Sequence, residues 1–183
     1  MTRDEAYKIL TKYITSQNLF RHALATEMVM RALAPKFEGD VETWGIVGLL
    51  HDADYELCKD HPENHGLLLF ENEKNIPQDI MYAIKSHNYA DTKVMPIGKM
   101  DWSITCCDEL AALIVAAAKA HPDKKLASLT VEYVINRIRQ KDFAKGAKRD
   151  ALYLCQEKLG IPLEEFVTIA LIAIQTISSQ LDL

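Results

Sequence analysis

The chain has 183 residues, of which 49% are hydrophobic and 26% are charged, with seven Gly and six Pro. This length fits one domain that can bury a core of its own. The net charge of −5 lacks the basic excess typical of general nucleic-acid binding, although it leaves room for a local basic patch. We therefore expect a globular protein that does not bind nucleic acid.

The N-terminal sequence MTRDEAYKIL carries charges where a secretory signal needs an apolar stretch. No run reaches the roughly 18 uninterrupted apolar residues that predict a membrane span. The four cysteines form no CxxC pair. We expect reduced thiols, a cytoplasmic location and no association with a membrane.

Apolar residues recur with helical periodicity along almost the whole chain, and no alternating β-branched run predicts a strand. Asp40 is suited to cap one helix, Gly160 to end another, and Pro162 to open the last. The pattern predicts an all-α, single-domain helical bundle over residues 1–183. Helices are expected over residues 4–16, 18–34, 41–55, 62–73, 77–87, 99–119, 130–140, 143–159 and 162–181.

Histidine and aspartate residues interrupt several of these apolar helices. Asp108 is the most informative, because Asp108 and Glu109 are the only charged residues between Trp102 and Ala118. An ionised carboxylate in an apolar interior needs a partner, and a divalent metal ion is one such partner. Histidine and carboxylate ligands together favour Fe, Mn, Zn, Co or Ni over Ca or Mg. The candidate ligands are His22, His51, Asp52, His65, His87 and Asp108.

Each candidate also has an ordinary structural interpretation. A lone histidine on an apolar helix can be a hydrogen-bonded core residue, and Asp108 can be paired with an Arg or Lys. His61, near the start of a predicted helix, and His121, in a polar turn, are interpreted as residues without chemistry. What favours a metal site is the joint order and spacing of the six candidates.

That order resembles the H…HD…D pattern of the HD-domain superfamily, whose members are helical, metal-dependent phosphohydrolases. His22, the pair His51-Asp52 and Asp108 stand at the positions of the pattern. Members with two metal ions have two further histidines before the last Asp, where this chain has His65 and His87.

The motifs HDADYEL, HPENHG and AIKSHN are also similar to uncharacterised bacterial HD hydrolases. By motif the resemblance covers residues 18 to about 120, so we expect a metal-site core there, with helices from 121–183 packed on it. Two features depart from characterised branches. Asn88 replaces a second adjacent His of the HD-GYP phosphodiesterases, whose GYP motif is absent, and Tyr55 replaces a Glu of the 5′-nucleotidases.

The resemblance implies hydrolysis of a phosphate ester or anhydride, with a nucleotide or dinucleotide as the small phosphorylated substrate. It implies two divalent transition-metal ions, which would activate water and neutralise charge on the phosphoryl oxygens. Asp52 would bridge them. Asp54 and Glu56 are candidates, on position alone, for the catalytic proton donor. The first ion is assigned to His22, His51, Asp52 and Asp108, and the second to Asp52, His65 and His87.

Two basic residues are candidates for binding substrate phosphate. Lys85 lies two residues before His87, and Arg149 ends the basic segment 137–149. An arginine there could hold two phosphate oxygens at once. The alternative for both is an ordinary solvated side chain, since charge runs usually face water.

Two other functions compete with the enzyme hypothesis. An HD-like domain can bind a metal or nucleotide as a sensor without turnover, and a helical interaction module can contain histidines incidentally. The sequence has lost none of the six candidate ligands, which argues against a degenerate binder. The oligomeric state is not predicted.

Overall fold

The protein is all-helical, as the sequence predicts, in a computed structural model that describes residues 1–183. The π-helical turn Cys155–Leu159 continues α9, and 3-10 turns occupy Ala34–Phe37, Pro62–Asn64 and Leu126–Ser128. The α-helices are α1 (Arg3–Tyr13), α2 (Gln17–Leu33), α3 (Val41–Leu50), α4 (Leu68–Asn72), α5 (Gln78–His87), α6 (Tyr89–Thr92), α7 (Lys99–Ala120), α8 (Val131–Arg139), α9 (Arg149–Leu154), α10 (Leu163–Gln175) and α11 (Ser178–Leu181).

Local sequence signals account for several helix ends. The Asp40 carboxylate accepts the backbone N–H of Thr43, so Asp40 caps α3 as predicted. Gly160 adopts the left-handed conformation, with φ of 75°, and ends the helical run at Leu159. Pro162 then stands directly before α10, where its fixed φ and missing N–H cost little.

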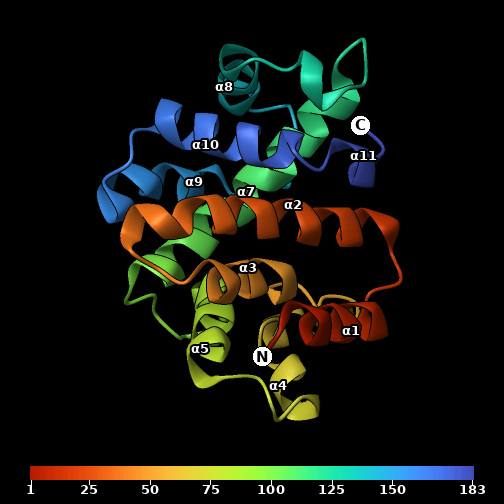
Figure 1. The fold of residues 1–183 in the computed structure, drawn as a ribbon, viewed down its shortest axis with the longest axis vertical. Helices are drawn as coiled ribbons and strands as arrows, with labels where there is room; N and C mark the ends of the chain where they lie inside the picture. Colours follow the sequence, from red (N-terminus) through yellow and green to blue (C-terminus); the bar gives the residue numbers. More distant parts are fainter.

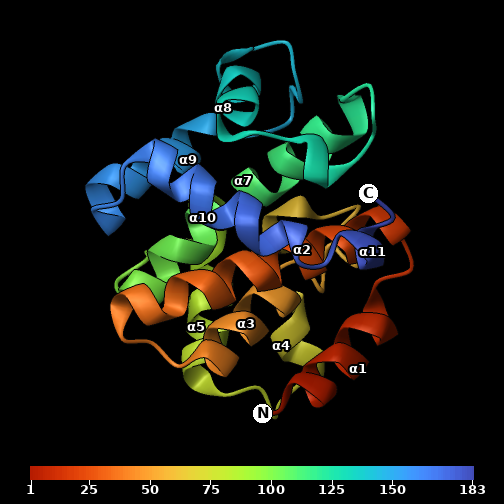
Figure 2. The same cartoon turned by 45° about the horizontal axis from the view of Figure 1, so that its top comes forward.

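The two longest helices, α2 and α7, organise the bundle. α2 crosses the middle of the molecule, with α3 on one side and α10 on the other, while α7 packs against α2, α5 and α9 (Figure 1). In the turned view, α8 and α9 remain on one side and α1, α3, α4 and α5 on the other (Figure 2). One cluster of 46 buried apolar residues runs through all these elements, as a single domain requires. None of the helices combines the length and apolarity that a bilayer crossing demands.

The helix expected over 4–16 ends at Tyr13, and the one expected over 162–181 is divided into α10 and α11. Three further expected helices, all next to the candidate site, are shorter than predicted. The helix expected over 41–55 ends at Leu50, and turns replace it up to Asp60. The helix expected over 62–73 is reduced to a 3-10 turn and α4, since Gly66 between them has φ of 87°. The helix expected over 143–159 begins only at Arg149.

The contact between α2 and α3 is unusually close. A Cβ at Gly48 would lie 2.8 Å from both Glu27 Cα and Thr26 O, so only glycine allows this approach of the two backbones. The side chain of the same Glu27 is buried, and its carboxylate accepts from the guanidinium groups of Arg3 and Arg31. These ion pairs hold α1 against α2 and compensate the buried charge.

Candidate metal centre

The end of α3 delivers His51 and Asp52 to the centre of the bundle. Every residue from Trp44 to Leu50 is buried, and the His51 side chain has no exposed surface. His51 Nδ1 donates to the carbonyl of Gly48 at 2.8 Å, which fixes the ring and directs Nε2 away from its own helix. The apolar run before the HD pair therefore anchors it in the core.

The first group of ligand atoms comes from three helices or their ends. His22 of α2 brings its Nε2 atom to 2.9 Å from Asp108 Oδ1 of α7 and 3.1 Å from His51 Nε2. Asp52 Oδ2 lies 3.5 Å from His22 Nε2. The four residues each place a ligand atom within 4.8 Å of the others, as a common metal ion requires.

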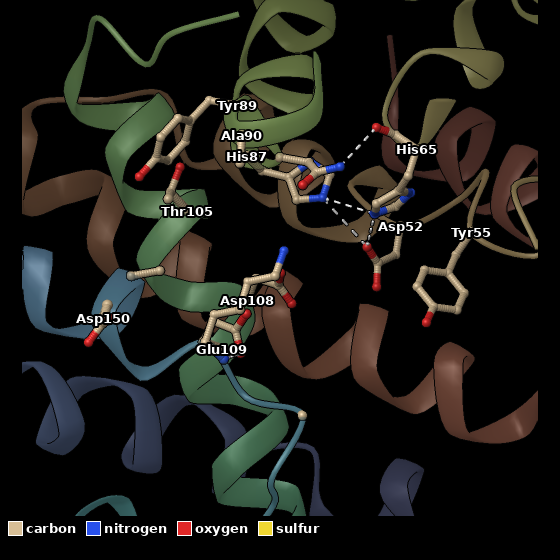
Figure 3. Close-up of a pocket in the computed structure, with 14 residues that line it drawn as sticks. Asp52, Tyr55, His65, His87, Tyr89, Ala90, Thr105, Asp108, Glu109 and Asp150 are labelled. Atoms are coloured by element: carbon tan, nitrogen blue, oxygen red, sulfur yellow. Dashed lines mark hydrogen bonds and ion pairs between the residues drawn. The ribbon is translucent and has the colours of Figure 1, made fainter. Parts of the chain in front are cut away.

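A second group shares Asp52 with the first. His65 Nε2 lies 3.0 Å from Asp52 Oδ1 and 3.1 Å from His87 Nε2. Figure 3 shows these three side chains pointing toward one another, with Asp108 on α7 across the pocket. The structure thus brings together all six residues that the sequence singles out, in the two expected sets with Asp52 common to both.

In three of the histidine rings, the hydrogen bond made by Nδ1 determines which ring nitrogen carries the hydrogen. The Nδ1 atoms of His51 and His87 face the carbonyls of Gly48 and Ile84, which can only accept. His65 Nδ1 faces the Asp54 carboxylate at 2.9 Å. When these three rings are neutral, each Nε2 atom therefore presents a lone pair toward the other ligands. The lone pairs of His65 and His87 face each other at 3.1 Å and repel unless a cation lies between them.

The spacing and the chemistry of the donor set fit transition-metal ions. Two nitrogen atoms about 2.1 Å from one ion are roughly 3 Å apart when the angle between the bonds is near 90°. The measured Nε2 separation of 3.1 Å in each histidine pair agrees with this value. Imidazole and carboxylate donors, with a hydrogen-bond partner behind three of the rings, are typical of Fe, Mn, Zn, Co or Ni sites.

Protons bound to the histidines are the alternative to metal ions as the positive charges of this cluster. Burial lowers the pKa of His51, but the Asp52 charge and the hydrogen bond to Asp108 outweigh burial and raise it to about 9. For His65, burial is likewise outweighed by hydrogen bonds to Asp52 and Asp54, which raise its pKa to about 10. His87 is different: burial and the neighbouring charges of His65 and His51 lower its pKa to about 4.

The carboxylates of Asp52 and Asp108 stay ionised because histidine rings surround them. Burial opposes the charge on Asp52, but the positive charge of His51 and the hydrogen bond from His65 keep its pKa well below the usual range. Burial also opposes the charge on Asp108, and its hydrogen bonds to His22 and His51 depress that pKa too. The site therefore holds two negative charges, one on the buried Asp52 and one on the half-buried Asp108, and both need positive partners.

Asp54 has a structural task that differs from the predicted one. Its carboxylate accepts from His65 Nδ1 and from the backbone N–H groups of Gly66 and Leu69. It is 1% exposed and does not line the pocket above the metal centre. The assignment of Asp54 as catalytic proton donor is therefore corrected: Asp54 orients His65. Cys58 also lies near this pair, but the Asp54 oxygens are already occupied by donors.

Glu56, the other proposed proton donor, points elsewhere. Its carboxylate accepts from the backbone N–H and hydroxyl of Thr15, just before α2. His61 is exposed and pairs with Glu63, and His121 ends α7 beside Asp123. Neither histidine approaches the six ligands, in agreement with their interpretation as residues without chemistry.

A pocket of about 530 Å³ opens above the two ligand groups. Sequence reasoning did not single out most of its walls, because Thr105, Asp150 and Tyr89 carry no motif. Gly146 and Lys148 are the residues of the basic segment 137–149 that reach the pocket, and only Lys148 brings a charge. The lining residues are Asp52, Tyr55, His65, His87, Asn88, Tyr89, Ala90, Thr105, Asp108, Glu109, Gly146, Lys148, Asp150 and Ala151.

Neither predicted substrate-binding residue lines this pocket. The Lys85 ammonium group lies 5.2 Å from the ring centroid of Phe70, so its stem follows the opposite side of α5. The Arg149 guanidinium donates to the backbone carbonyl of Ile138 at the end of α8 and to those of Gln140 and Phe143 in the loop that follows. Both assignments are corrected, since the first side chain covers an aromatic ring and the second organises a loop.

In comparisons with known proteins, no family model, no curated protein and no solved structure matches the chain.

Proposed function

We propose that this protein is a metal-dependent phosphohydrolase of the HD-domain type, which acts on a nucleotide or dinucleotide phosphate. One observation carries the proposal: buried histidine Nε2 lone pairs and two carboxylates converge in two groups that share Asp52, at the floor of an open pocket. A purely structural cluster would not need access to solvent.

The roles of the chain's residues follow from their contacts. His22, His51, Asp52 and Asp108 would hold one ion, and Asp52, His65 and His87 a second. Divalent ions bound there would supply Lewis acidity, activating water and neutralising charge on the phosphoryl oxygens. Asp54 and the carbonyls of Gly48 and Ile84 keep the rings in the orientation and tautomer that ligands need.

The pocket wall supplies the remaining functions. Lys148 is the one basic side chain among the lining residues, and its charge suits a phosphoryl oxygen. Tyr55, which is 48% exposed, packs edge-on against His65 at the pocket wall. The substrate class rests on the resemblance to HD enzymes, and the net charge of −5 argues against nucleic acid as a partner.

The first test combines metal analysis with a substrate panel. Protein purified without chelator is expected to contain Fe, Mn, Zn, Co or Ni, and to release phosphate from at least one phosphoester, mononucleotide, cyclic dinucleotide or dinucleoside polyphosphate. Asp52→Ala should lose both ions and all activity, whereas His61→Ala should keep both. A wild-type protein free of metal contradicts the proposal. Bound metal without any turnover would indicate the sensor alternative.

A further inference from the structure

The pocket above the metal centre has a second lobe. A cavity of about 320 Å³ lies beside the larger one, and the two share Tyr55, His65, Asn88 and Lys148 as walls. Because these four residues border both spaces, the two cavities form one site with two lobes. Each lobe by itself has a volume in or near the range of small-molecule pockets.

The two lobes differ in charge. The larger lobe contains four carboxylates against one ammonium group, which suits cations. The smaller lobe contains Lys59 and Lys148 against the single carboxylate of Asp91, so its charge is net positive and suits an anion. Neither lysine ammonium group makes a hydrogen bond or ion pair within the chain, unlike Lys145, which pairs with Asp142.

The loop that precedes α9 fixes the backbone of Lys148. Arg149 gathers the loop carbonyls of Gln140, Phe143 and Ala144 around its guanidinium group. The Lys148 N–H donates to Glu109 Oε2 at 2.8 Å, and Glu109 directly follows the ligand Asp108 in α7. Lys148 is therefore held at a defined distance from the metal centre, although its side chain remains exposed.

We infer that the smaller lobe is a second anion subsite, in which Lys59 and Lys148 bind a phosphate group beyond the one that is hydrolysed. This inference rests on the proposed function. It narrows the substrate to molecules with at least two phosphoryl groups, such as nucleoside polyphosphates, and disfavours simple monoesters. The first phosphoryl group lies over the metal ligands, and the second lies between the two lysines across the shared wall.

The test uses two phosphonates that cannot be hydrolysed, with metal-loaded protein and isothermal titration calorimetry. Methylenediphosphonate carries two anionic groups, and methylphosphonate carries one. Wild-type protein is expected to bind the diphosphonate more tightly. Lys59→Gln, at a residue that lines the smaller lobe alone, should weaken diphosphonate binding by about ten-fold and leave methylphosphonate binding unchanged. Lys148→Gln, at a residue that lines both lobes, should weaken diphosphonate binding by about ten-fold or more. Lys145→Gln, in the same basic loop but outside both lobes, is the matched control and should change neither affinity.

The subsite is overturned by equal wild-type affinity for the two phosphonates, by no binding of either, by unchanged diphosphonate binding in either lysine variant, or by an equal loss for both ligands in Lys59→Gln. Elemental analysis of the protein recovered after titration verifies that the diphosphonate has not removed the ions. Because no turnover is involved, this outcome is separate from that of the proposed function. Tight, lysine-dependent diphosphonate binding without hydrolysis of any substrate leaves the subsite standing and refutes the phosphohydrolase.

Discussion

Gly48 of α3 lies directly against the backbone of Glu27 in α2, with room for a hydrogen atom but not for a methyl group. The same glycine provides the carbonyl that accepts from His51 Nδ1, while α2 carries His22 one turn before this contact. The closest approach of the two helices therefore sets the distance between two of the candidate ligands.

Gly48→Ala is expected to force α3 away from α2 and to separate His51 from His22. Overpacking of this kind typically costs about 1–3 kcal/mol, so the melting temperature should fall and the metal content should fall with it. Differential scanning calorimetry and elemental analysis measure both effects. Gly98→Ala is the control, because the nearest atom to its added Cβ is 3.8 Å away. Wild-type metal content in Gly48→Ala would show that the site does not depend on this spacing.

Asp54→Asn should selectively weaken the second ligand group. The amide cannot accept from His65 Nδ1 as strongly as the carboxylate does, so the ring loses its fixed orientation and part of its basicity. Changes behind a metal ligand usually reduce metal affinity by about 10- to 100-fold. Metal titration with competing chelators should reveal one weakened ion and one unaffected ion. Equal weakening of both ions contradicts the separate roles of the two groups.

Arg149→Lys should disorder the loop before α9 without removing metal. A lysine cannot reproduce the several hydrogen bonds that the guanidinium group donates to loop carbonyls, and bonds from charged donors are each worth about 1.5–3 kcal/mol. We expect a lower free energy of unfolding and faster amide exchange in residues 140–148, measured by denaturant titration and hydrogen exchange. Arg139→Lys, at an exposed side chain, should behave as wild type. Unchanged amide exchange in Arg149→Lys would show that Arg149 does not organise this loop.

The stability of the metal-free protein should depend on pH in a defined direction. His51 and His65 have folded-state pKa values of about 9 and about 10, above the ordinary value of 6.5. Their protonation therefore stabilises the fold fully below about pH 6.5, and this contribution is lost as the pH rises through about 9 to 10. Melting temperatures measured after chelation should fall across this interval.

Metal ions that occupy the same Nε2 atoms should suppress this dependence, since they displace the protons. His65→Gln should reduce the slope in metal-free protein, whereas His61→Gln, at an exposed ring, should leave it intact. Parallel pH curves for the metal-free and metal-loaded proteins would mean that these histidines are not the groups that titrate.

The helical class and the six clustered residues can be predicted because both leave a recognisable pattern in the sequence. His22 and Asp108 lie half-buried in helices with broad apolar faces, and the apolar run before His51 leads to burial of its ring. The resemblance to HD proteins then groups the residues into two sets. Their convergence in space agrees with that grouping.

The directions and partners of single charged side chains are what the sequence leaves open. Asp54 and Arg149 both carry a charge near the site, but loop backbone N–H groups and carbonyls attract them more than the pocket does. Lys85 turns to the Phe70 ring because α5 presents it on the far side from His87. The outcomes for Asp54 and Arg149 depend on loop conformations, which no periodicity encodes.

Consecutive residues of α7 serve two different purposes, since Asp108 points to the metal ligands and Glu109 holds the backbone of Lys148. A helix advances about 100° per residue, so removing one residue between Lys99 and Asp108 would rotate both carboxylates out of place together. The number of residues in the first half of α7 is thus a property of the site, as much as the identity of its ligands. Insertions and deletions should be tolerated in the loops on either side and excluded from this stretch.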